Sequence, residues 1–378
     1  MPDQEFIAPA RPVVGEDEID AAVRVLRSGM VVQGPEVAAF EEEFSALVDG
    51  RHCVAVNSGT SALHLSLVAA GIRPGDEVIV PSFSFAASAN AVRLAGGEPV
   101  FADIEPDHFT LDPASVTAAI GPRTAAIMPV HLYGHAADMT AIGAIADKHR
   151  LAVIEDAAQA HAATWQGTPV GAFGTAGCFS FYPTKNMHSL EGGMITTADA
   201  TFARNLRLLR NQGMEQRYAN EIVGANMRLT DVAAAIGRVQ LGKLEDWTEQ
   251  RRANAAALSA GLKGVLAPPE AEGARHVYHQ YTIRVPEGVA GGRDALQAAL
   301  KERDVGSAVY YPTPIHLLKP YLPGFTDLAG QQPPNRDWDL PETMKAAGEV
   351  LSLPVHPGLT EDDLGRIIDA VNGVAVGA

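Results

Sequence analysis

Short apolar runs alternate with longer amphipathic stretches through the first two thirds of the chain. The runs at 52–56, 76–81, 98–104 and 125–130 are rich in Val, Ile and Ala, and small or polar residues follow each of them. Runs of this length and composition are typical of buried parallel strands. The stretches between them read as helices. This alternation predicts an α/β fold with a mostly parallel central sheet and helices on both of its faces.

The rest of the chain predicts further helices and a second, smaller domain. Helices are expected at 15–29 and 35–50, and a long helix at 232–262 could carry the chain out of the large domain. After Pro268 the pattern changes to that of a compact α+β domain. Its predicted elements are a strand at 277–285, a helix at 293–304, a strand at 307–312, and two helices around a short strand at 344–374. We therefore predict a large domain at 1–250, N-terminal helices included, and a small C-terminal domain at 251–378.

The polar residues with the clearest chemistry lie in the stretch 151–193. An apolar run ends there at Asp156, which places this carboxylate at the carboxyl end of a predicted strand, where open α/β sheets hold their ligands. A second apolar run, 178–182, carries Ser180 and leads to Lys185 in a loop that two glycines close. Taken singly, such a lysine is usually a solvated surface residue, and such an aspartate is as often a helix cap or a magnesium ligand.

The order and spacing of these residues suit one cofactor, pyridoxal 5'-phosphate (PLP). PLP needs a lysine that bonds to its aldehyde, a carboxylate that keeps its ring nitrogen protonated, and donors for its phosphate. Lys185, Asp156 and Ser180 would supply these three functions.

The turn at Gly59, Thr60 and Ser61 adds a candidate anion site. It joins the predicted strand at 52–56 to a helix, and a helix N-terminus presents free N–H groups and the positive end of its dipole. An ordinary helix cap explains the turn by itself, but beside Asp156 and Lys185 we favour a phosphate site.

Other cofactor classes lose support. His131 and His135 are four residues apart, but Gly134 between them after a strand end makes a shared helix face and a metal pair a poor interpretation, so we expect no metal. The chain has no G-x-G-x-x-G after a strand, no P-loop, no H-E-x-x-H and no C-x-x-C. Nicotinamide enzymes, P-loop enzymes and zinc proteases are therefore disfavoured.

Composition narrows the setting. The 378 residues are 47% hydrophobic and 20% charged, as in an ordinary soluble protein, and a net charge of −16 argues against nucleic acid or an anionic membrane as partner. The two cysteines lie in apolar runs, which favours buried free thiols. We find no signal peptide and no membrane-spanning run, so we expect a cytoplasmic protein.

The motifs also resemble those of a known family. EDAAQAH, CFSFYPTKN and EGGMI are similar to segments of the DegT/DnrJ/EryC1/StrS sugar aminotransferases, and the resemblance extends from about residue 8 to about residue 372. It implies the PLP-dependent transferase fold type I of the aspartate aminotransferase superfamily. It also implies transfer of an amino group from L-glutamate to a keto sugar, and a nucleotide-linked 4-keto-6-deoxy sugar is the substrate that we expect.

The resemblance gives roles to individual residues. Lys185 would be the catalytic lysine, Asp156 the partner of the ring nitrogen, and Gln159 a contact of the ring or its 3-hydroxyl. Phe85, just past a strand end, would stack on the ring, although a core phenylalanine is the plainer interpretation of the residue alone. The polar segment 214–231 is expected to be an ordered loop. In the family it crosses a homodimer, so that Asn226, otherwise a turn residue, would bind the phosphate in the partner's site.

Substrate contacts also follow from the resemblance alone: His188, Glu191, Tyr311 and His316. The lysine loop, KNMHSLEGG, departs from the glycine-containing loop of many relatives, which leaves the identity of the sugar open. An aminotransferase of cyclitol ketones and a non-enzymatic PLP-binding regulator are alternatives. A sugar dehydratase of the same fold is disfavoured, because the branch of that kind has histidine in place of the lysine.

Overall fold

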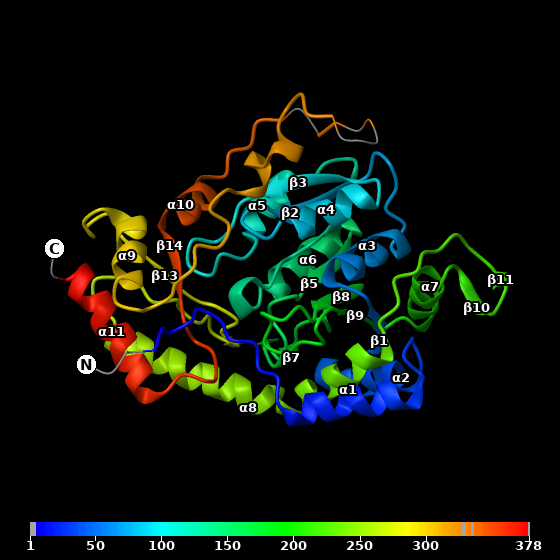
Figure 1. Cartoon of the computed structure of the whole chain (residues 1–378). Helices are drawn as coiled ribbons and strands as arrows, with labels where there is room; N and C mark the ends of the chain where they lie inside the picture. Colours follow the sequence, from blue (N-terminus) through cyan, green and yellow to red (C-terminus); the bar gives the residue numbers. More distant parts are fainter. Residues whose placement is uncertain (1–4, 327–329, 331, 334–335, 377–378) are drawn as a thin grey trace.

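The centre of the protein is a seven-stranded sheet, seen here in a computed structural model that describes residues 5–326, 330, 332, 333 and 336–376 (Figure 1). Its strand order is β1-β9-β8-β5-β4-β2-β3. The strands are β1 (His52–Val56), β2 (Glu77–Pro81), β3 (Glu98–Ala102), β4 (Thr124–Ile127), β5 (Ala152–Asp156), β8 (Ala176–Ser180) and β9 (Gly193–Thr197). All pairs are parallel except the two made by β9, so the prediction of a mostly parallel sheet is confirmed.

The antiparallel strand has a simple cause. Parallel neighbours need a crossover connection, usually a helix, whereas antiparallel neighbours can be joined directly. Residues 181–192 join β8 to β9 without any helix, so β9 returns beside β8 in the opposite direction. This connection is the loop that carries Lys185, and the sheet therefore holds it at both ends.

Helices cover both faces of the sheet, because side chains of each strand alternate between two apolar cores. In β1, Cys53 and Ala55 join one core, and Val54 and Val56 join the other. The first core includes residues of α2 (Pro35–Ser45), α5 (Pro113–Ala119) and α6 (Met139–His149). The second includes residues of α3 (Gly59–Ala69), α4 (Ala87–Leu94) and α7 (Ala200–Arg210). Both cysteines are buried and free, as predicted.

The C-terminal part of the chain builds a separate apolar core, at the left of Figure 1. It contains the antiparallel pair β13 (Tyr281–Arg284) and β14 (Val350–Leu353) and the helices α9 (Gly292–Lys301) and α11 (Glu361–Ala375). Ile7, from the other end of the chain, packs into the same core. The domain boundary near residue 250 stays a prediction, because α8 (Asp231–Gly261) runs unbroken past it.

Helix α8 connects these parts of the molecule. Thr230 caps it, and its first residue, Asp231, accepts hydrogen bonds from the backbone N–H groups of Gly34 and Val37 at the start of α2. Its far end supplies Ala255 and Leu258 to the C-terminal core. A helix α1 (Glu16–Ser28) packs along its first half.

Two local predictions need correction. No strand forms at 307–312, where Ala308 alone pairs with Ser352, and Tyr311 has a left-handed φ of 57° that extended strands do not adopt. The segment 214–231, predicted as a loop, begins with a short hairpin of β10 (Met214–Gln216) and β11 (Ala219–Asn220), which extends away from the sheet at the right of Figure 1.

The remaining elements are short. They are η1 (Ala46–Val48), η2 (Leu132–Gly134), β6 (Thr164–Trp165), β7 (Thr168–Pro169), β12 (Ala274–Arg275), η3 (Ile315–Leu317), η4 (Lys319–Tyr321) and α10 (Pro341–Glu349). Among the helices in the described ranges, none combines the length and the apolar character that crossing a membrane requires.

Candidate active site

The carboxyl ends of β5 and β8 and the N-terminus of α3 meet at a cleft of about 480 Å³. It is the place where open α/β sheets bind ligands. Residues from distant parts of the sequence line it: Ser58, Gly59, Thr60, Leu63, Ser84, Phe85, Ala87, Val130, Asp156, Ala158, Gln159, Ser180, Tyr182, Thr184, Lys185, Glu191, His279, Gln280, Tyr310 and Tyr311. Most of the residues predicted for the site are therefore brought together in one chain.

Asp156, the last residue of β5, is buried at the base of the cleft. One carboxylate oxygen accepts a hydrogen bond from the Ser88 hydroxyl at 2.8 Å, and the other accepts one from the Ala158 N–H at 3.2 Å. Burial raises the pKa of this carboxyl, while Ser88, Ala158 and the charge of Lys185 act against the rise. A carboxylate with two hydrogen bonds retains acceptor capacity for a cationic group in the cleft.

Lys185 enters the cleft from the loop between β8 and β9. Burial lowers the pKa of its ammonium to about 8, and the charge of Asp156 partly opposes that shift. Near pH 8 about half of the Lys185 side chains are therefore neutral, and only the neutral amine can attack a carbonyl carbon. Among the described residues lining the cleft, Lys185 is the only lysine.

An anion cradle faces these two residues. Ser58 caps α3 through its hydroxyl, which accepts from the Ser61 N–H at 3.1 Å. Gly59 and Thr60 are the first two residues of the helix, so their N–H groups have no intrahelical partner. Ser180 lies so close that a Cβ on Gly59 would stand 2.7 Å from the Ser180 Cβ, and glycine is therefore needed here.

Gln159 joins the cleft to two tyrosines. Its side-chain oxygen accepts from the Tyr133 N–H and its amide donates to the Tyr311 hydroxyl, both at 2.8 Å. The Tyr133 and Tyr311 rings stack 6.2 Å apart. Tyr311 is thus fixed against the strand-end loop, and its left-handed backbone is maintained by these contacts.

Other predicted residues lie at the margin of this cleft or away from it. Phe85 lines the mouth with 63% of its surface exposed. Ser61 belongs to the cap of α3 and does not line the cleft. Asn226 is exposed at the base of the hairpin, where it pairs with Asn211. The roles given to these residues stay predictions.

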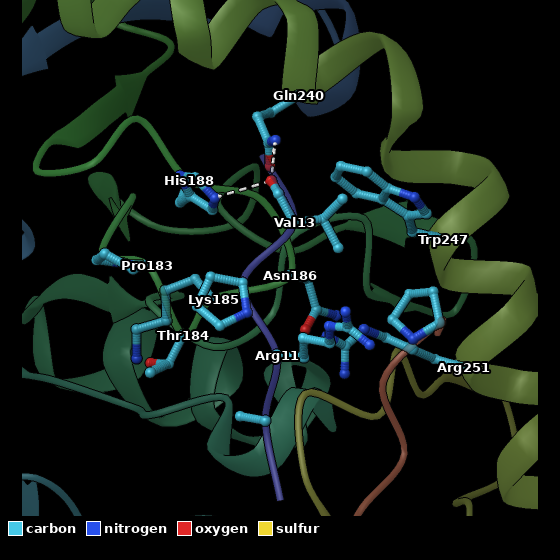
Figure 2. A pocket seen from close by; sticks show the side chains of 13 residues that line it. Arg11, Val13, Pro183, Thr184, Lys185, Asn186, His188, Gln240, Trp247 and Arg251 are labelled. Atoms are coloured by element: carbon cyan, nitrogen blue, oxygen red, sulfur yellow. Dashed lines mark hydrogen bonds between the residues drawn. The ribbon is translucent and has the colours of Figure 1, made fainter. Parts of the chain in front are cut away.

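His188 and His316 are also outside the cleft. His188 donates to the Val13 carbonyl at 3.2 Å, as Figure 2 shows, and so joins the lysine loop to the N-terminal segment. The Nδ1 atom of His316 lies 2.6 Å from the Ser82 hydroxyl, and its ring packs against Phe101. Glu191, by contrast, lines the cleft. The substrate contacts assigned to these residues stay predictions.

Sequence reasoning missed several residues of the site. His279, Gln280, Tyr182 and Tyr310 line the cleft, and Ser88, outside its lining, orients Asp156. Ser88 lies within an apolar helix and gives no signal in the sequence. Tyr310 could have been found, because it is next to Tyr311 in the same aromatic segment.

Directly beneath the site, a buried network holds the strand ends in place. Glu155, beside Asp156 but on the other face of the sheet, accepts from the N–H groups of Gly171, Phe173 and Gly174 at 2.7 to 2.9 Å. Its fourth partner is His131 Nε2 at 3.1 Å. Since His131 Nδ1 accepts from the Ala137 N–H, the network assigns the proton to Nε2 and a neutral ring.

These residues fit PLP. The cradle of α3 and Ser180 suits a phosphate, Asp156 suits a protonated ring nitrogen, and Lys185 suits an aldehyde carbon. Two observations support this fit. The Asp156 carboxylate can accept further hydrogen bonds, and Gly59, which has no side chain, leaves room beside Ser180 for an anion.

The fold and the site define an aminotransferase of fold type I. The chain belongs to the DegT/DnrJ/EryC1/StrS aminotransferase family, whose profile matches residues 12–372. The dTDP-3-amino-3,4,6-trideoxy-alpha-D-glucose transaminase of Streptomyces venezuelae is 45% identical, over 94% of this chain and 91% of that protein. A Geobacillus stearothermophilus protein named pleiotropic regulatory protein is 44% identical, over 92% and 91%.

A solved structure extends the likeness to three dimensions. The S. venezuelae DesV structure in complex with a ketimine intermediate superposes with a TM-score of 0.88 at 43% identity, covering 95% of this chain and 94% of that one. The predicted fold class and the predicted enzyme class are both confirmed.

Proposed function

We propose that this enzyme uses PLP to transfer an amino group from L-glutamate to a nucleotide-linked keto sugar, with a 4-keto-6-deoxy sugar as the expected acceptor. The observation that carries the proposal is the meeting of Lys185, Asp156 and the α3 cradle in one cleft. The name of the S. venezuelae relative, a dTDP-sugar transaminase, supports the nucleotide sugar. That relative is named for a 3-amino product, so both 3-keto and 4-keto sugars belong in the test.

Each residue would have one task. When bound, PLP supplies an electron sink for the carbon that loses or gains a proton. Asp156 would hold a positive charge at the ring nitrogen, which that sink requires. Lys185, released by the incoming amine, would carry the proton between the substrate carbon and the cofactor, first as base and then as acid. The lowered pKa of Lys185 suits its action as base and as acid near neutral pH.

The attachment of the cofactor is tested directly. After borohydride reduction of the holoenzyme, peptide mass analysis should find the pyridoxyl group on Lys185. An adduct on Lys148 or Lys243 would contradict the assignment.

The acceptor is tested with a panel of ketones. L-Glutamate first converts the bound cofactor to its aminated form, and 3-keto nucleotide sugars, 4-keto nucleotide sugars and cyclitol ketones are then added separately. We expect turnover with a nucleotide sugar. Turnover with a cyclitol ketone only would favour the alternative reaction.

A regulatory role is the second candidate, favoured by the name of the Geobacillus relative. The intact lysine and acid of the cleft favour catalysis. A folded, PLP-loaded protein that releases no 2-oxoglutarate from L-glutamate would favour regulation.

We also propose a homodimer with shared active sites, in which Asn226 contacts the phosphate in the partner's site. Asn226 is exposed and absent from the cleft of its own chain. Large apolar side chains are exposed beside the cleft, on the hairpin and just after it, as expected of a surface that a second copy covers. They are Phe85 at 63%, Tyr182 at 48%, Tyr218 at 81% and Val223 at 93%.

The sharing is tested with hybrid dimers. Asn226→Glu places an anion beside the phosphate, and Lys185→Ala removes the catalytic amine. In a hybrid of the two inactive variants, one site has both lesions and the other has none. Activity should return when they are unfolded and refolded together. If native mass measurement finds the hybrid and activity stays absent, Asn226 does not serve a partner's site.

A further inference from the structure

A second, smaller pocket lies against Lys185, between the N-terminal segment, the lysine loop and α8 (Figure 2). We call it the basic pocket. Its lining is Ala10, Arg11, Pro12, Val13, Pro183, Thr184, Lys185, Asn186, His188, Gln240, Trp247, Arg251 and Pro357. This lining contains two arginines and a lysine but, among the described residues, no aspartate or glutamate.

Arg251 is the unusual residue of this pocket. It is 8% exposed and lies on α8. One guanidinium nitrogen donates to the Tyr278 carbonyl at 3.2 Å, whereas Nε has no hydrogen-bond partner among the residues that the structure describes. In the described part of the chain, no carboxylate pairs with Arg251, although burial lowers its pKa only to about 10 and it stays charged. A buried cation without a counter-charge is costly unless a ligand supplies one.

A second guanidinium faces the same space. Arg11 comes from the exposed segment at 11–14 and has no ion pair with any described residue. Figure 2 shows Arg11 and Arg251 turned toward one space beside Asn186. The segment is held in place where the Val13 carbonyl accepts from Gln240 at 2.9 Å and from His188.

The basic pocket adjoins the main cleft. Lys185 and Thr184 line both spaces, so the catalytic amine stands at their boundary. Asn186, which lines the basic pocket, lies 3.2 Å from Nδ1 of His279, which lines the cleft. A molecule that reacts at Lys185 can therefore extend one of its groups toward Arg251.

We propose that Arg251 and Arg11 form a carboxylate subsite for the amino donor, which rests on the function proposed above. A carboxylate matches a guanidinium through paired, charge-assisted hydrogen bonds. The pocket volume of about 20 Å³ admits roughly one or two water-sized groups, which suits a carboxylate and is too small for a sugar diphosphate. A dicarboxylic donor such as L-glutamate would use this subsite.

The test measures binding of glutarate, a dicarboxylate without an amine, to the PLP-loaded enzyme by calorimetry. Arg251→Gln should weaken glutarate about tenfold or more, the scale of a lost charge-assisted hydrogen bond. Arg252→Gln is the matched control: Arg252 is the next residue of α8, pairs with Glu270 and does not line the pocket. Glutarate should bind this control as it binds wild type.

Donor kinetics then show which carboxylate is held. In Arg251→Gln, KM should rise for L-glutamate and stay unchanged for the keto sugar. A rise for L-glutamate but not L-glutamine places the side-chain carboxylate at Arg251, and an equal rise for both places the α-carboxylate there. Unchanged glutarate affinity in a folded Arg251→Gln enzyme overturns the subsite.

A second variant is measured if Arg251→Gln does not fold. Arg11→Gln then replaces it, because Arg11 is exposed and its loss leaves the core intact. Unchanged glutarate affinity in Arg11→Gln would overturn the proposal equally. Failure of the proposed function looks different: wild type would bind glutarate through Arg251 yet aminate no sugar in the panel.

Discussion

Glu155 and Asp156 are neighbours at the end of β5, yet they lie on opposite faces of the sheet and differ in one respect. Glu155 has four hydrogen-bond donors around it, three backbone N–H groups and His131, so its acceptor capacity is used within the protein. Asp156 has two, and faces the cleft with capacity left. Both are buried, so burial alone does not distinguish a structural acid from a functional one.

The buried arginines repeat this difference. Arg210 is 4% exposed, pairs with Glu41 and donates to the Ala55 carbonyl at 2.6 Å. Arg251 is also buried, at 8% exposed, and has no acidic partner among the described residues. A charge that the protein neutralises serves the fold, and a charge left open is available to a ligand. The predictions below test this distinction.

The largest effect is expected at Asp156. Asp156→Ala removes the charge that would face the ring nitrogen, and transamination should fall by roughly a thousandfold or more, about 4 kcal/mol in the barrier. Steady-state kinetics measure the loss, and thermal unfolding checks that the variant is folded. Activity within about tenfold of wild type would mean that the open acid has no catalytic role.

Glu155→Gln should lower stability and leave activity nearly unchanged, the reverse of Asp156→Ala. An amide has one acceptor oxygen for four donors, so buried N–H groups lose partners and the free energy of unfolding should fall by about 2–4 kcal/mol. Urea unfolding measures it. The activity per folded molecule should stay close to that of wild type. A stable variant that has lost its activity would reverse the roles given to the two acids.

The cradle predicts an intermediate effect. In Gly59→Ala the added methyl would meet Ser180, so helix α3 or β8 must shift and the affinity for PLP should fall by about tenfold, as for one lost charge-assisted hydrogen bond. Fluorescence titration of the apoenzyme measures it. Gly143→Ala, whose Cβ meets nothing within 4 Å, is the control and should bind PLP normally.

Lys185 predicts a pH dependence. Its pKa is about 8, so the rate at which the apoenzyme captures PLP should fall about tenfold per unit below pH 8 and level off above it. In Asp156→Asn the anion that raises this pKa is gone, so the midpoint should move to lower pH. Stopped-flow absorbance follows the capture. A midpoint near the ordinary lysine value would show that burial does not tune this amine.

What could be predicted from the sequence was what lies close together in it. Asp156, Ser180 and Lys185 fall within thirty residues of one another, and strand-end logic was enough to join them. Arg11 and Arg251 stand 240 positions apart, and only the packing of the N-terminal segment on α8 brings them to one pocket. Ser88 was hidden because a serine in an apolar helix is unremarkable until its partner is known.

The wrong strand at 307–312 has the same origin. Its valine and two tyrosines favour an extended chain, but the contacts of Tyr311 with Gln159 and Tyr133 fix a left-handed backbone there. The local sequence indicates which backbone conformation a segment prefers, but here contacts with distant residues fix a different conformation.

Helix α8 acts as a lever between the two ends of the molecule. Its 31 residues span about 46 Å, and its first residue, Asp231, holds the start of α2, while its far end lies in the C-terminal core. A tilt of about 5° around the Asp231 end would displace the other end by about 4 Å. Arg251 lies in the outer part of α8, so a rotation of the C-terminal core would move Arg251 relative to Lys185 and Asp156, which the sheet holds.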